Sequence, residues 1–240
     1  GAVNNNKASG VFRACVFAGN QALPLGDQPG TGGAVYYIGR LADQFPPELG
    51  QPAVADPLFV NCLIENNTAE GSGGAVFATE ALGLFVNCTI VRNVATAAGG
   101  ASYAYDGAKP TFVNTIFWDN SPETIRDDEE FFFDVTPPVD EPAPAQTTAT
   151  YCLLPEEHEG DGNIVSETPR FRAVAQSNYR LRSTSPCVDA GRSTAAVEFG
   201  EVTTDFQGDP RGTDGIGEAR GDGSDYDIGY DEYIGDRKSV

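Results

Sequence analysis

The sequence predicts an all-β protein folded as a right-handed parallel β-helix, a solenoid with inserted loops and an irregular C-terminal cap. Two repeated patterns predict this fold. A Phe-Val-Asn strand occurs at residues 59–61, 85–87 and 112–114, and a Gly-Gly-Ala motif occurs at residues 32–34, 73–75 and 99–101. Where no loop intervenes, both recur about every 26 residues. The amphipathic segments of about ten residues that a helical repeat would need do not occur.

Each coil is expected to hold about three short strands, so that like positions of successive coils lie roughly 4.8 Å apart. The asparagines of the Phe-Val-Asn strands are predicted to form one column at a bend, because Asn tolerates the left-handed backbone conformation. With that bend, the Phe before each Asn and the apolar residue after it can both face inward. This first column comprises Asn61, Asn87 and Asn114.

A second asparagine column follows from the pattern of an apolar residue three positions before an Asn. Its members are Asn20, Asn67, Asn93 and Asn120. The Gly-Gly pairs then allow the backbone to turn where a Cβ would clash. The cysteines at residues 15, 62 and 88 share one register, which favours small buried thiols that fill the core over disulfides or a metal between coils.

The repeats define residues 1–164 as β-helix coils, with insertions at residues 39–57 and 122–148. Residues 165–240 lose the repeat and are predicted to form a β-rich cap packed on the same solenoid, because an open sheet edge would act as a template for stacking. The second insertion contains Phe131, Phe132 and Phe133 between acidic runs. They are interpreted as an interaction loop, with burial against their own coil as the alternative.

Composition excludes several functional classes. The formal net charge is −20, and such a surface repels nucleic acid phosphates, so no nucleic acid partner is expected. No apolar run approaches the roughly 20 residues of a membrane-spanning helix. His158 is the only histidine and no Gly-x-Ser-x-Gly motif is present, which argues against serine or cysteine hydrolase chemistry.

The repeats resemble those of chlamydial polymorphic outer-membrane proteins, and the downstream half resembles the secreted bacterial right-handed β-helix proteins of the choice-of-anchor Q type. The residues that carry the second resemblance are NTIFWDN (114–120), YCLL (151–154), GDGNI (160–164), NYRL (178–181), SPCVDAG (185–191), DFQGDPR (205–211) and DIGYDEY (227–233). The sequence departs from that family at the insertion near residues 122–148 and at Tyr230-Asp231. The resemblance implies a secreted or surface-attached β-helix and implies no reaction.

We therefore expect a non-catalytic extracellular or cell-surface module with a structural or adhesive role. Its expected partners are further copies of itself, in a homo-oligomer or filament, or an extracellular glycan. The alternative is a polysaccharide-active hydrolase or lyase that uses surface carboxylates, with or without calcium. The sequence assigns no catalytic residue.

Calcium is the only cofactor that the sequence suggests. Asp222, Asp225 and Asp227 place oxygen ligands at short spacing among glycines, as hard cations prefer, and Asp214 and Glu218 precede them. This segment lacks the spacing of an EF-hand loop. A solvated acidic loop is the alternative, and the sequence favours it over a calcium site.

Overall fold

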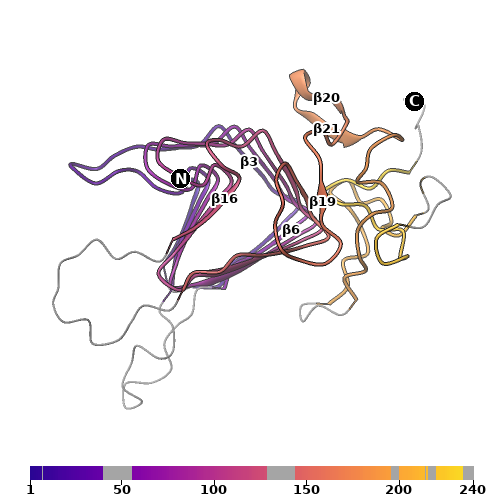
Figure 1. Ribbon diagram of the computed structural model, residues 1–240, viewed down its shortest axis with the longest axis horizontal. Coiled ribbons are helices and arrows are strands. Elements are labelled where there is room, and N and C mark those ends of the chain that lie inside the picture. Colours follow the sequence, from indigo (N-terminus) through magenta and orange to yellow (C-terminus); the bar gives the residue numbers. More distant parts are fainter. Residues whose placement is uncertain are drawn as a thin grey trace, which may run out of the picture.

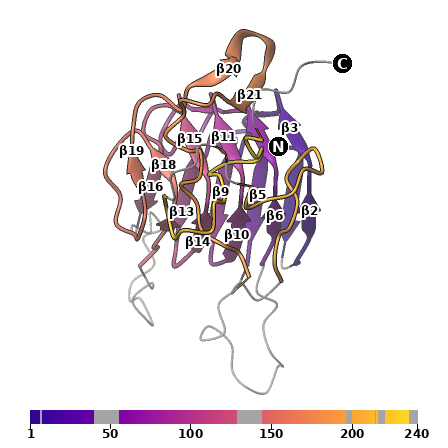
Figure 2. The same ribbon diagram turned by 90° about the vertical axis from the view of Figure 1, so that its right-hand side faces the viewer.

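The computed structural model describes residues 1–6, 8–39, 56–128, 144–195, 200–213, 215 and 220–234. Short parallel strands stack coil upon coil and enclose a triangular section (Figure 1). Figure 2, turned by 90°, shows the strands of successive coils side by side. This architecture confirms the predicted parallel β-helix.

Two parallel sheets, A and B, form two sides of the triangle. Sheet A contains, in spatial order, β1 (Val3–Asn6), β5 (Val35–Ile38), β9 (Val76–Thr79), β13 (Ser102–Tyr105) and β16 (Ile125–Asp128). Sheet B contains β2 (Val11–Arg13), β6 (Leu58–Val60), β10 (Leu82–Val86), β14 (Lys109–Val113) and β17 (Thr148–Thr150). Both predicted insertions lie between sheet A and sheet B. The first follows β5, whereas the range predicted for the second, residues 122–148, includes β16, so the connection to sheet B begins only after Asp128.

Sheet C forms the third side, and the short sheet D leads from it back to sheet A. Sheet C contains β3 (Val16–Ala18), β7 (Leu63–Glu65), β11 (Thr89–Val91), β15 (Ile116–Trp118), β18 (Leu153–Leu154) and β19 (Ile164–Val165). Sheet D contains β4 (Gln21–Ala22), β8 (Thr68–Ala69) and β12 (Val94–Ala95). An antiparallel hairpin follows, made of β20 (Phe171–Ala173), the 3₁₀ turn η3 (Val174–Gln176) and β21 (Asn178–Leu181).

The bend between sheets B and C explains the Phe-Val-Asn repeat. Asn61, Asn87 and Asn114 have φ of 52°, 51° and 50°, the left-handed conformation that Asn tolerates. The bend turns the chain, so that Phe85 before it and Ile90 after it are both fully buried. Phe85 stacks between Phe59 and Phe112, with ring centroids 4.6 and 4.8 Å apart.

The second asparagine column lies inside the coils, at the corner between sheets C and D. The side-chain amide of Asn67 donates to Oδ1 of Asn93 (2.8 Å), and that of Asn93 donates to Oδ1 of Asn120 (3.0 Å). Asn20 donates in the same way to Asn67 (2.8 Å). The ladder therefore satisfies buried polar groups through neighbouring coils.

The described part of the C-terminal segment runs along the flank of the coils. Side chains from Leu63, Val91, Ile116 and Leu153 on the outer side of sheet C form one apolar cluster with Tyr179, Val188 and Ile228. On the outer side of sheet B, Val202 packs against Val60, Val86 and Val113. Figure 2 shows this segment, orange to yellow, crossing in front of the strands. These contacts cover the corner between sheets B and C, and the predicted cap over an open end of the solenoid stays a prediction.

Buried polar groups fasten this segment to the corner. The fully buried Arg211 donates through Nη1 to Glu232 Oε2 (3.2 Å) and through Nη2 to Asn61 Oδ1 (3.0 Å) and the Gly229 carbonyl (2.9 Å). Asn61 Nδ2 in turn donates to the Thr204 carbonyl (2.7 Å). The first asparagine column thus bonds to the C-terminal segment.

The carboxyls beside this network predict how stability depends on pH. Burial raises the pKa of Asp231 from its ordinary 3.8 to about 6, although Arg180 Nε lies 3.2 Å from its Oδ1. Between those two values the folded protein binds more protons than the unfolded chain, so this group favours folding at low pH and disfavours it as the pH rises through about 6.

The free energy of unfolding of the wild type should therefore fall between about pH 5 and pH 7.5 because of this group. We expect Asp231→Asn to reduce that fall by about 1 to 3 kcal/mol. The measurement is urea unfolding at both values, with the exposed Asp161→Asn as the control. Identical pH dependence in Asp231→Asn and the wild type would contradict the assignment.

Candidate binding face on sheet A

An aromatic side chain points outward from three successive coils of sheet A. Tyr36, Phe77 and Tyr103, here called the aromatic row, are direct neighbours in the strand register. Strand alternation places them outside, because the residues on either side of Tyr36, Val35 and Tyr37, are fully buried. Each ring in the row is partly exposed.

The rings of the aromatic row stack on one another. Tyr36 and Phe77 have centroids 5.4 Å apart and planes inclined by 10°, and Phe77 and Tyr103 have values of 5.3 Å and 16°. Because the rings stack face to face, their edges point outward. The spacing of the coils sets the distance between the rings before any ligand binds. The row is therefore a rigid apolar ridge, to which the two tyrosines add hydroxyl groups.

Polar side chains border the ridge on both sides. The Tyr103 hydroxyl donates to Asp128 Oδ2 (2.9 Å), and Arg126 Nη2 lies 2.7 Å from Asp128 Oδ1. Burial and the bond to Asp128 raise the pKa of Tyr103, so its hydroxyl stays a neutral hydrogen-bond donor. At the other end, the exposed Asn4 is the register neighbour of Tyr36.

Two carboxyl groups lie at the turn from sheet A to sheet B, beside the ridge. Glu80 and Asp106 occupy equivalent turns of adjacent coils, with φ of 49° and 47°. Burial raises the pKa of Asp106, and a side-chain hydrogen bond with Glu80 opposes that rise. A carboxyl with a raised pKa beside a second carboxyl is a feature of some polysaccharide-cleaving sites.

The structure places the seven asparagines of the two predicted columns in the scaffold. Asn67, Asn93 and Asn120 form the interior ladder at the C–D corner. In the first column, Asn114 Nδ2 donates to Asn87 Oδ1 (2.9 Å) and to the Arg192 carbonyl (2.8 Å). All five cysteines are free, and those at residues 62, 88 and 152 are buried in the coils.

The three predicted calcium ligands have different surroundings. Asp222 is exposed and accepts backbone N–H bonds from Ser193 and Ser224. Asp227 is fully buried and accepts them from Asp189 and Tyr233. Within the described ranges, no group of three or more His, Cys, Asp or Glu side chains is arranged to hold a metal. Asp214 and Glu218 lie outside those ranges, as do Phe131, Phe132 and Phe133 of the predicted interaction loop.

The sequence also contains a signal for the aromatic row. Each Gly-Gly-Ala motif is followed, after one further residue, by an aromatic residue: Tyr36, Phe77 or Tyr103. A left-handed glycine opens each copy, with φ of 68°, 72° and 67° at Gly32, Gly73 and Gly99. The turn fixes the phase of the strand that follows, so the aromatic residue faces outward each time.

Comparison with known proteins gives a match to one coil. The model of the Chlamydia polymorphic membrane protein repeat matches residues 61–79, from Asn61 at the B–C corner to the end of β9. No curated protein and no solved structure matches the chain. Among the residues that the structure describes, no helix has the length and apolar character to cross a membrane. The chain is therefore similar, over this coil, to a β-helix-like repeat, while the resemblance to choice-of-anchor Q proteins stays an expectation.

Proposed function

We propose that the protein is a non-catalytic extracellular or cell-surface module that adheres to a neutral glycan through the aromatic row. The observation that carries this proposal is the outward stack of Tyr36, Phe77 and Tyr103 in one register. The similarity of residues 61–79 to a repeat of Chlamydia polymorphic membrane proteins supports a surface location.

Ring spacing and charge support this choice of ligand. The centroid spacings of 5.4 and 5.3 Å are close to the length of one sugar unit in an extended polysaccharide, so the exposed edge of one ring can contact each successive sugar. Tyrosine offers apolar area and a hydroxyl from a side chain with little conformational freedom. The net charge of −20 repels acidic polysaccharides, which favours a neutral chain.

Glu80 and Asp106 support a second candidate, a polysaccharide hydrolase. They lie at one edge of the face, and a buried acid with a raised pKa can serve as a proton donor. This candidate requires chain scission that Asp106→Asn abolishes. We place it second because Asp106 is 8% exposed, which restricts its contact with a polymer.

We expect Phe77→Ala to weaken retention on neutral polysaccharides by about tenfold or more, because it removes the central ring. Affinity electrophoresis through gels containing each polysaccharide measures this loss, and thermal unfolding verifies that the variant is folded. Leu82→Ala is the matched control, since Leu82 is an exposed apolar residue on sheet B (39% exposed). Equal retention of the wild type and Phe77→Ala would contradict the proposal. If the wild type self-associates in sedimentation and Phe77→Ala does not, the partner of the aromatic row is a second copy of the protein instead.

A further inference from the structure

The β20–β21 hairpin carries a concentration of positive charge in an acidic protein. Residues 168–188 contain Arg170, Arg172, Arg180 and Arg182 and no Asp or Glu, whereas the whole chain has 15 basic and 35 acidic residues. The hairpin packs on the outer side of sheet C, where Phe171 contacts Trp118 and the Tyr179 hydroxyl donates to Glu65 (2.9 Å). It therefore lies on a different sheet from the aromatic row.

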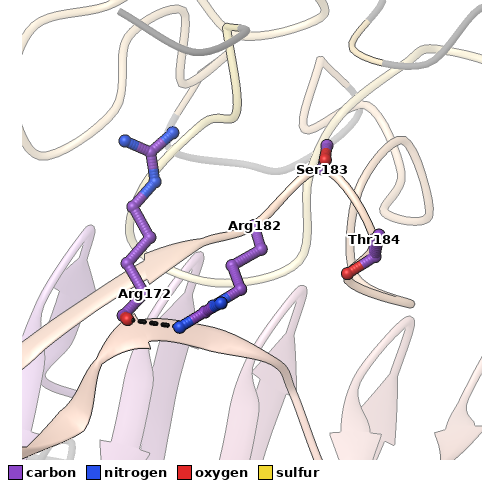
Figure 3. A pocket seen from close by; sticks show the side chains of 4 residues that line it. All are labelled: Arg172, Arg182, Ser183 and Thr184. Carbon is purple, nitrogen blue, oxygen red and sulfur yellow. Dashed lines mark hydrogen bonds between the residues drawn. The ribbon is translucent and has the colours of Figure 1, made fainter.

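A pocket of about 370 Å³ opens beside this hairpin, lined by Arg172, Arg182, Ser183 and Thr184 (Figure 3). Its size is in the range of small-ligand sites. Its lining combines guanidinium donors with two hydroxyl groups, and no carboxylate is among the lining residues that the structure describes. This set of donors suits an anion.

Backbone contacts hold the arginines in place. Arg182 Nε donates to the Phe171 carbonyl (2.9 Å), and its Nη2 donates to the Arg172 carbonyl (2.7 Å), the contact drawn in Figure 3. Arg170 Nη1 donates to the Thr184 carbonyl (2.7 Å), which braces the turn that supplies the two hydroxyl groups. These bonds fix the guanidinium groups before a ligand arrives and so lower the entropic cost of binding.

Within the part of the chain that the structure describes, two of the four arginines have no ion-pair partner. Arg180 pairs with Asp231. Neither Arg170 nor Arg182 has a carboxylate partner among the described residues. The two bonds of Arg182 to carbonyl groups use only part of its five N–H donors, and within the described ranges the others have no acceptor.

We propose that this pocket binds a single tetrahedral oxyanion, the sulfate or phosphate ester group of a sugar. Guanidinium forks match the oxygens of such a group, and Ser183 and Thr184 add hydroxyl donors. The acidic remainder of the protein repels a long polyanion. At physiological salt, charges further away than about 8 Å are largely screened, so a compact anionic group in the pocket interacts mainly with the nearby arginines. The site therefore selects an isolated ester over nucleic acid or a densely charged polymer.

Isothermal titration with galactose 6-sulfate, galactose 6-phosphate and galactose tests this site. We expect saturable binding of at least one ester, weakened by added salt, and none of galactose. The ester that binds more tightly then identifies the natural group. The absence of saturable binding by either ester, or equal binding of galactose, would overturn the proposal.

A matched pair of variants at Ser183 locates the binding in the pocket and leaves every arginine of the hairpin in place. Ser183→Glu introduces a competing carboxylate and should abolish ester binding, while Ser183→Gln, of similar size but neutral, should keep it within about threefold. Arg182→Lys keeps the charge but loses the fork and should weaken binding about tenfold. Arg13→Gln, on sheet B, is the control for net charge. Unchanged ester binding in Ser183→Glu would refute the assignment.

Discussion

Arg211→Leu is expected to lower the free energy of unfolding by about 3 to 5 kcal/mol. Arg211 and Glu232 are both fully buried, and the substitution would leave the Glu232 carboxylate without its cationic partner, close to the buried Asp227. It would also remove the donor to Asn61, which joins the C-terminal segment to the coils. Urea unfolding measures the loss, and limited proteolysis should show earlier cleavage within residues 200–234.

The matched control is Arg92→Leu. Arg92 forms an exposed ion pair with Asp119, with an Nε to Oδ2 distance of 3.5 Å, and such pairs contribute at most about 1 kcal/mol. If both substitutions cost the same, the buried network would not fasten the C-terminal segment.

Phe85→Ala is expected to cost about 3 to 5 kcal/mol as well, through loss of buried area and the cavity left behind. Phe85 is fully buried between two rings at 4.6 and 4.8 Å, and the coils above and below are held in register by their strands. The site can therefore collapse only in part.

The comparison for this prediction is Phe77→Ala, which removes a ring from the outer stack of the same coil. Because Phe77 is partly exposed, its removal should cost clearly less stability than that of Phe85, while it has the larger effect on glycan retention. Denaturant unfolding of both variants gives the two free energies. Equal destabilisation would contradict the inward and outward assignment of the two rings.

The repeated features of the coils are the part of this fold that could be predicted from the sequence. A period near 26 residues predicts the two columns at the B–C bend, because each coil makes the same bend at the same place. These columns are the stacked Phe59, Phe85 and Phe112 and the left-handed Asn61, Asn87 and Asn114. The aromatic row obeys the same period. Its signal was missed because the Gly-Gly-Ala motif was interpreted only as a turn.

The placement of the C-terminal segment could not be read from the sequence in this way. Arg211 and Asn61 are 150 residues apart, and their contact belongs to no repeat. Composition alone also does not distinguish a solvated acidic loop from a buried network: Asp222 and Asp227 are close in sequence, yet one is exposed and the other fully buried. The pocket combines Arg172 from β20 with Arg182, Ser183 and Thr184, which follow β21, so it depends on the pairing of these two strands.

The most direct test of a non-catalytic glycan-binding module is one incubation that measures both binding and cleavage. Neutral and acidic polysaccharides are mixed with the purified protein, with and without millimolar calcium, and retention, new reducing ends and unsaturated uronate absorbance are recorded. We predict that a neutral polysaccharide retains the protein and gains no new chain ends. Chain scission that disappears in Asp106→Asn or Glu80→Gln would contradict the account and identify a hydrolase at the edge of sheet A.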